Sequence, residues 1–115
     1  MSKMYIAVLE DFLDFMTPTL VAHAVLSHHL HVDRDISYGQ YKNMYNDWRI
    51  NSFKKVVLRV DQKEFNNISQ LPNVTLSYES NSTRLPACAV VVVDDTIPNV
   101  LKFAKLWEPV QRAGD

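Results

Sequence analysis

The run 88–93, CAVVVV, constrains the fold more than any other segment, because it offers no polar side chain to solvent on either face. A strand that faces water on one side alternates apolar and polar residues, whereas a strand that helices cover on both sides is continuously apolar. The run therefore predicts a sheet with helices on both of its faces.

The remaining segments predict the other elements of this sheet and its covers. β-prone runs at 4–9, 55–60 and 74–78 predict three more strands. A threonine and a proline at 17–18 start a helix that ends near residue 30. Capping-box pairs at 37/40 and 61/64 open a helix over 38–48 and another that ends near residue 71, and Thr96 opens a last helix to Trp107.

This order is strand, helix, helix, strand, helix, strand, strand, helix. Strands that alternate with helices in this way are typical of the α/β class. We therefore predict a three-layer α/β/α domain with a mixed, roughly four-stranded sheet.

The composition fits one domain over residues 1–115, since the chain has 47% apolar residues, two glycines and no linker-like tract. Its net charge of −1 argues against binding a nucleic-acid backbone by bulk charge, which needs a basic excess. The charge does not argue against binding of a small nucleotide or a tRNA 3′ end, which a few placed groups could hold. The single cysteine, Cys88, excludes an internal disulfide and a cysteine-rich zinc module, and we expect it to be a small core residue.

We expect a cytoplasmic protein without membrane contact. No apolar stretch approaches the roughly 18 residues that a membrane-spanning helix needs, and the first nine residues look like a strand rather than a secretion signal. Two glycines leave no glycine-rich phosphate loop, and we expect neither a cofactor nor a metal.

Three segments together resemble the type II peptidyl-tRNA hydrolases. The first ends in Leu20-Val21-Ala22-His23-Ala24, similar to the family's helix motif, in which a glutamine precedes a His-Ala pair. The second is 54–71, a strand followed by an Asp-capped helix. The third is the polar segment 77–83, SYESNST, which resembles the family's Asp-Ala-Gly-x-Thr loop ahead of a buried strand. The resemblance implies the family's fold and a tendency to form homo-oligomers, as dimers or larger assemblies.

The departures from the family concern its chemistry. Met16 and Leu20 stand where the resemblance expects a lysine and a glutamine, and no lysine occurs between Lys3 and Lys42. Glu79 replaces the loop's aspartate, while Thr83 is kept. Loss of one group that stabilises an oxyanion often costs about 3 kcal/mol, so slow or absent catalysis is expected.

Three hypotheses for the function follow. The first is a domain that binds, and so sequesters, a nucleotide-type ligand. The resemblance to a phage-encoded branch of the family makes a host cyclic-nucleotide immune signal one such ligand, met in the host cytoplasm. The ligand-binding residues expected are Met16, Thr17, Thr19, Leu20, His23, Ser80, Asn81, Ser82 and Arg84. The second is an active ester hydrolase of peptidyl- or aminoacyl-tRNA, which would use Glu79, Thr83 and His23. The third is an interaction module that uses the aromatic helix 38–48.

Other polar clusters have both a functional and a structural interpretation. His23, His28, His29 and His31 suggest a metal site, but imidazoles on a partly exposed helix end account for them better. His23 either faces a pocket or is a core histidine.

The helix 38–48 has an aromatic stripe that comprises Tyr38, Tyr41, Tyr45 and Trp48. Such a stripe can stack bases, yet more often it forms a core or a subunit contact. Lys54, Lys55 and Arg59 are expected to be solvated edge charges.

Overall fold

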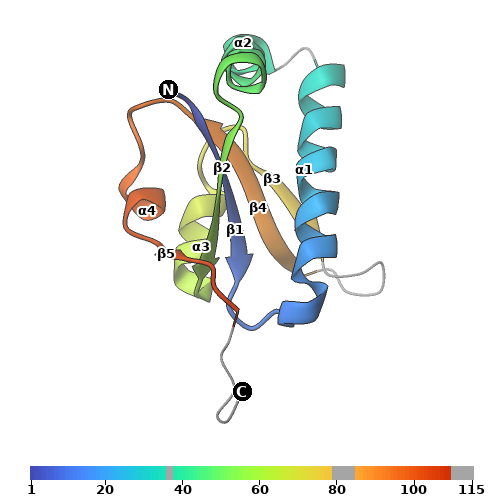
Figure 1. The fold of residues 1–115 in the computed structure, drawn as a ribbon, viewed down its shortest axis with the longest axis vertical. Helices are drawn as coiled ribbons and strands as arrows, with labels where there is room; N and C mark the ends of the chain where they lie inside the picture. Colours follow the sequence, from blue (N-terminus) through green and yellow to red (C-terminus); the bar gives the residue numbers. More distant parts are fainter. Residues whose placement is uncertain (36–37, 79–84, 110–115) are drawn as a thin grey trace.

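The computed structural model describes residues 1–35, 38–78 and 85–109, whose strands form one mixed sheet with helices on both faces (Figure 1). The five strands are β1 (Lys3–Leu9), β2 (Lys54–Val60), β3 (Thr75–Tyr78), β4 (Pro86–Val93) and β5 (Lys105–Leu106). The helical elements are η1 (Asp14–Met16), α1 (Thr17–Arg34), α2 (Gly39–Asp47), η3 (Trp48–Ser52), α3 (Gln62–Ser69) and α4 (Asn99–Lys102). None of these helices is long and apolar enough to cross a membrane.

The strand order is β3-β4-β1-β2-β5, so β1 lies in the middle of the sheet. It runs parallel to β2 and antiparallel to β4, with Ala7 paired to Leu58 on one side and to Ala89 on the other. β3 pairs antiparallel with β4 and forms one edge. The chain returns from β1 to its parallel neighbour β2 through α1 and α2, as a parallel pair requires.

Burial of the central strands confirms the predicted α/β class. All but the terminal residues of β1 and β4 are buried, on both faces of the sheet. Figure 1 shows α1 on one side of the sheet and α3 with α4 on the other. The continuously apolar run 88–93 is thus the sequence signature of a strand enclosed between two helical layers.

The aromatic stripe on the second helix forms part of the core. Tyr41, Tyr45 and Trp48 are buried and lie in a row, with neighbouring ring centroids 6.4 and 5.4 Å apart. The indole of Trp48 donates to the carbonyl of Lys54 at 2.7 Å. These rings are not available as an exposed face for a partner or for a stacked base.

The predicted last helix, 96–107, is wrong in length. The helix covers only Asn99–Lys102, because Pro98 disfavours helical backbone in the residue before it and serves as the N-cap. The chain then becomes a fifth strand, since Lys105 and Leu106 pair with β2. The prediction of roughly four strands missed this short one.

The first two helices also end later than predicted. α1 continues to Arg34, about one turn past the predicted end. After α2 the helix continues as the π-helical turn η3, which ends at Phe53 in a left-handed conformation. Of the two predicted capping boxes, the one at Asp61 and Glu64 is present, with both reciprocal hydrogen bonds formed. Ser37 of the other lies outside the described residues.

Arg59 is not the solvated edge charge that was expected. Its guanidinium is mostly buried, donates to the Asp14 carboxylate at 3.0 Å, and donates to the carbonyls of Glu10 and Glu108. It also lies 4.9 Å over the ring of Trp107. One arginine therefore ties the end of β2 to the loop before α1 and to the segment after β5.

Candidate functional site

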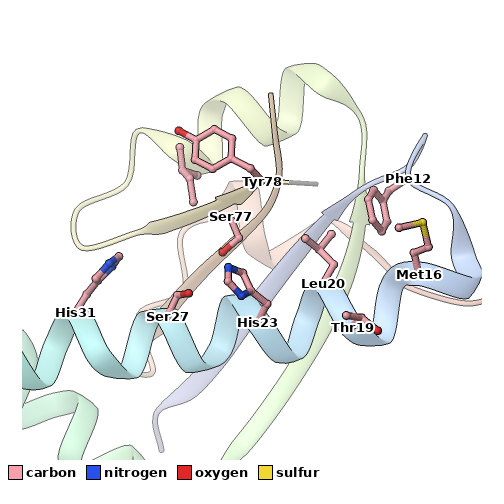
Figure 2. Close-up of a pocket in the computed structure, with 10 residues that line it drawn as sticks. Phe12, Met16, Thr19, Leu20, His23, Ser27, His31, Ser77 and Tyr78 are labelled. Atoms are coloured by element: carbon pink, nitrogen blue, oxygen red, sulfur yellow. The ribbon is translucent and has the colours of Figure 1, made fainter. Parts of the chain in front are cut away.

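The candidate site is a groove of about 560 Å³ between α1 and the edge strand β3 (Figure 2). Among the described strands β3 is the outermost on this side, so the groove opens at this edge of the sheet. Its volume falls within the range of small-molecule sites. Ten residues line it: Phe12, Met16, Thr19, Leu20, His23, Ser27, His31, Leu76, Ser77 and Tyr78.

One helical stripe supplies four of the ten lining residues. Leu20, His23, Ser27 and His31 recur at intervals of three and four, which puts them on one face of α1. The adjoining stripe, with Ala24, points into the core. The groove therefore follows the border between the buried and the exposed side of the helix.

The groove has an apolar and a polar end. Figure 2 shows Phe12, Met16 and Leu20 together at the start of α1, while His23, Ser27 and His31 follow along the helix. Phe12 and Leu20 are buried, and His23 and His31 are exposed. A ligand with a flat apolar part and a polar part fits these two ends.

The hydroxyl of Ser77 is the unusual polar group of the site. Ser77 is only 3% exposed, and its Oγ is a buried side-chain atom without a hydrogen-bond partner in the described structure. Figure 2 shows this oxygen and the imidazole of His23 pointing toward one another across the groove. A buried hydroxyl without a partner costs about 1 to 3 kcal/mol, which a ligand group bonded to it would recover.

The charges of the groove limit its chemistry. Among the lining residues that the structure describes there is no carboxylate, lysine or arginine. The polar groups are two imidazoles, the hydroxyls of Thr19, Ser27 and Ser77, and the phenol of Tyr78. Such a set can donate and accept hydrogen bonds but provides no fixed charge to stabilise an oxyanion.

A buried hydrogen-bonded network lies in the core behind the polar end of the groove. His28 is fully buried, with Nε2 2.7 Å from the Tyr41 hydroxyl and Nδ1 2.7 Å from Oγ1 of Thr75. The Tyr41 oxygen accepts from the backbone N–H of Val92, so its own proton goes to Nε2. His28 then carries its proton on Nδ1 and donates to Thr75, whose oxygen lies 3.5 Å from Nδ1 of the groove residue His31.

His28 is neutral in this network. Burial lowers its pKa to about 4, and the neighbouring His31 and His29 add to the effect. Burial also raises the pKa of Tyr41, so the phenol keeps its proton. The expectation that the histidines lie on a partly exposed helix end is therefore wrong for His28, because a spacing of four from Ala24 puts it on the buried stripe.

The predicted site residues divide into three groups. Met16, Thr19, Leu20 and His23 line the groove. Thr17 does not line it, since it is buried and its hydroxyl donates to the carbonyl of Leu13 at 3.1 Å. The predicted loop residues lie outside the described residues; they are Glu79, Ser80, Asn81, Ser82, Thr83 and Arg84.

Several lining residues were not predicted as part of a ligand site. Ser27 and His31 follow His23 at intervals of four, so helical spacing alone pointed to them once His23 faced a groove. Ser77 and Tyr78 stand in the segment that carried the resemblance, but no sequence signal distinguishes a buried unpartnered serine from an exposed one. Phe12 belongs to the loop before α1, where no motif in the sequence marks it as part of a site.

Two further predictions concern metals and the thiol. No group of three or more His, Cys, Asp or Glu residues within the described ranges could hold a metal ion. Cys88 is a core residue, as predicted, and burial raises the pKa of its thiol to about 12. The thiol is therefore protonated and unreactive in the folded protein.

No protein-family model matches this chain, and no curated protein is significantly similar to it in sequence.

Proposed function

We propose that this domain binds a nucleotide-type ligand in the groove between α1 and β3 and does not turn it over. The observation that carries the proposal is the buried, unpartnered hydroxyl of Ser77, which faces His23 within the groove. A structure keeps such a group at a cost to its stability, and hydrogen bonding to a ligand is the simplest compensation.

The two ends of the groove support a nucleotide as the ligand. A base is flat and largely apolar on its faces, which suits the end formed by Phe12, Met16 and Leu20. A sugar and a phosphate need several hydrogen bonds, which His23, Ser27 and Ser77 supply at the other end. A volume of about 560 Å³ is compatible with one such molecule.

The lining also supports binding rather than hydrolysis. The resemblance assigns Met16 to the position of the family's lysine, and Met16 contributes a thioether to the groove. No lysine or arginine among the described lining residues replaces the missing cation. Sequestration of a signalling nucleotide requires tight binding without turnover. The resemblance to a phage-encoded branch of the family makes a host cyclic-nucleotide immune signal one such ligand.

A thermal-shift and calorimetry screen with nucleoside 5′-monophosphates, cyclic nucleotides and tRNA 3′-end fragments tests the proposal. A ligand at a hundredfold excess over its dissociation constant raises the unfolding free energy by about 2.7 kcal/mol. Absence of any stabilisation across the screen would refute nucleotide binding.

Ser77→Ala separates a ligand contact from a structural role. We expect about tenfold weaker binding, because one hydrogen bond to the ligand is lost. We also expect the unliganded variant to be as stable as the parent, because the substitution removes an unpartnered hydroxyl. Ser69→Ala on α3 is the matched control, since the Ser69 hydroxyl donates to the carbonyl of Phe65 and Ser69 does not line the groove. Unchanged affinity in Ser77→Ala would contradict the proposed site.

The alternative is an active hydrolase of peptidyl- or aminoacyl-tRNA. The facing positions of His23 and Ser77 favour this alternative. A hydroxyl beside an imidazole can act as a nucleophile, with the imidazole as its general base. However, neither a hydrogen bond between the two nor a third group orienting the His23 ring occurs in the described structure. Turnover of labelled peptidyl-tRNA that Glu79→Gln, Thr83→Ala or His23→Ala abolishes would establish the hydrolase and overturn the binding-only proposal.

A homo-oligomer, a dimer or larger, is the remaining part of the proposal and rests on the family resemblance. Sedimentation equilibrium at micromolar concentration measures it directly. A mass of one chain, 13.3 kDa, would contradict it.

A further inference from the structure

The groove does not end at His31. A second groove, of about 760 Å³, adjoins it along the last turns of α1 and shares two of its lining residues, Ser27 and His31. The other residues that line it are Leu30, Arg34, Asp35 and Tyr38. From Leu20 to Arg34 the helix rises by about 21 Å, which is longer than one nucleotide spans.

The second groove has side chains that the first lacks. Arg34 is the one guanidinium among the described residues that line this groove; it is exposed and forms no ion pair with another described residue. A guanidinium matches the oxygens of a phosphate by two parallel hydrogen bonds. Tyr38 is half-buried and packs on the core ring of Tyr41 at a centroid distance of 5.9 Å, so its ring is held in place.

The shared residues lie where a linking phosphate would be needed. His31 and Ser27 can donate hydrogen bonds to an anion that lies between the two grooves. His31 is positioned in turn by Thr75, at the end of the buried network of His28. The second groove also has one carboxylate among its described lining residues, that of Asp35.

We propose that the two grooves form one extended site for a dinucleotide, that is, two nucleosides joined through phosphate. The first nucleoside occupies the groove of Ser77, the linking phosphate lies by His31 and Arg34, and the second base stacks on Tyr38. This inference rests on the proposed function, because it names the ligand class of the same site. Stacking on an aromatic side chain adds a contact that a mononucleotide does not make.

Calorimetry with matched ligands tests the inference. The probes are AMP, GMP, CMP and UMP, each compared with the 3′–5′-linked dinucleotide of the same base in linear and in cyclic form. For the best base we expect a dinucleotide to bind at least tenfold tighter than the monophosphate. Arg34→Ala and Tyr38→Leu should remove this gain and leave monophosphate binding unchanged, whereas Ser77→Ala should weaken both ligands. Arg49→Ala is the matched control, since Arg49 is exposed and lines neither groove.

The outcomes distinguish this inference from the proposed function. Equal affinity for monophosphates and dinucleotides overturns the extended site, as does a gain in dinucleotide affinity that survives Arg34→Ala. Neither result contradicts nucleotide binding in the first groove. Absence of binding by every probe overturns both. Tyr38→Leu keeps an apolar side chain against Tyr41, and its circular dichroism spectrum and melting temperature show whether a loss of binding comes from unfolding.

Discussion

The imidazole of His28 and the hydroxyl of Tyr41 form a hydrogen bond of 2.7 Å in the core, where it joins α1 to α2. The same oxygen accepts from the N–H of Val92 in β4, so one phenol connects two helices and the central sheet. The bond also fixes the tautomer of His28 and thereby the donor that reaches Thr75 behind the groove.

Tyr41→Phe should destabilise the fold by about 2 to 4 kcal/mol. The substitution leaves two buried groups, Nε2 of His28 and the N–H of Val92, without a partner, and each costs about 1 to 3 kcal/mol. Urea unfolding followed by circular dichroism measures the difference. Tyr38→Phe is the control, because the Tyr38 hydroxyl forms no hydrogen bond in the described structure; a similar loss in both variants would argue against the network.

Stability should decrease as the pH is lowered from about 6.5 to about 4, because of His28. Its folded pKa of about 4 lies below the ordinary value of 6.5, so in this range the unfolded chain binds a proton that the folded protein does not. The unfolding free energy therefore rises with pH across the window, by about 3 kcal/mol in total.

Urea titrations at several pH values test this dependence in the parent and in His28→Gln. The variant is expected to be less stable at every pH. Its unfolding free energy should lack the rise with pH that the titration of His28 causes. The charged or titratable neighbours that act on His28 are His29, His31 and Tyr41. His29→Gln is the matched control and should keep the slope; if it loses the slope instead, the titrating group is not His28.

Arg59→Ala should cost about 2 kcal/mol and loosen the segment around β5. Hydrogen bonds that involve a charged group contribute about 1.5 to 3 kcal/mol, and the Arg59 guanidinium connects β2 to Asp14 and to Glu108. Hydrogen exchange of the Trp107 amide, which donates to Val57, reports the local loosening. Lys54→Ala on the same strand should have little effect, and Arg59→Lys should not restore protection, because an ammonium cannot reach these acceptors together.

The fold was predictable from local signals, and the site only in part. The β-branched runs and the Asp61 capping box are local, so their strands and helix appear within one or two residues of the predicted positions. His28 lies at helical spacing from Ala24, but its partners Tyr41 and Thr75 come from other elements, so its burial was not apparent. Arg59 is a similar case, since its acceptors are 45 and 49 residues away. Whether Ser77 has a partner depends on how α1 crosses β3, which no sequence pattern specifies.

Cys88 should resist alkylation until the protein unfolds. Its thiol is fully buried and its pKa is raised to about 12, so there is almost no thiolate to react and no access to it. Labelling with a chromogenic disulfide reagent in increasing urea should therefore follow the unfolding curve from circular dichroism. Labelling that precedes global unfolding would mean that β4 opens locally. Cys88→Ser should be less stable than Cys88→Ala, because it buries a hydroxyl in the apolar centre of the sheet.

Met16→Lys tests which end of the groove holds the base. If the apolar end takes the base, an ammonium at position 16 replaces an apolar contact and must lose hydration, so nucleoside monophosphates should bind about three- to tenfold more weakly. Met16→Leu keeps the apolar contact and should bind like the parent. Calorimetry at low and at high salt measures both variants.

Tighter binding of Met16→Lys that high salt abolishes would have the opposite meaning. The phosphate would then lie near the start of α1, where the family resemblance expects a lysine, and the base would lie beside Ser77. The sign of one affinity change thus decides the orientation of the ligand, and with it whether the second groove can receive the other half of a dinucleotide.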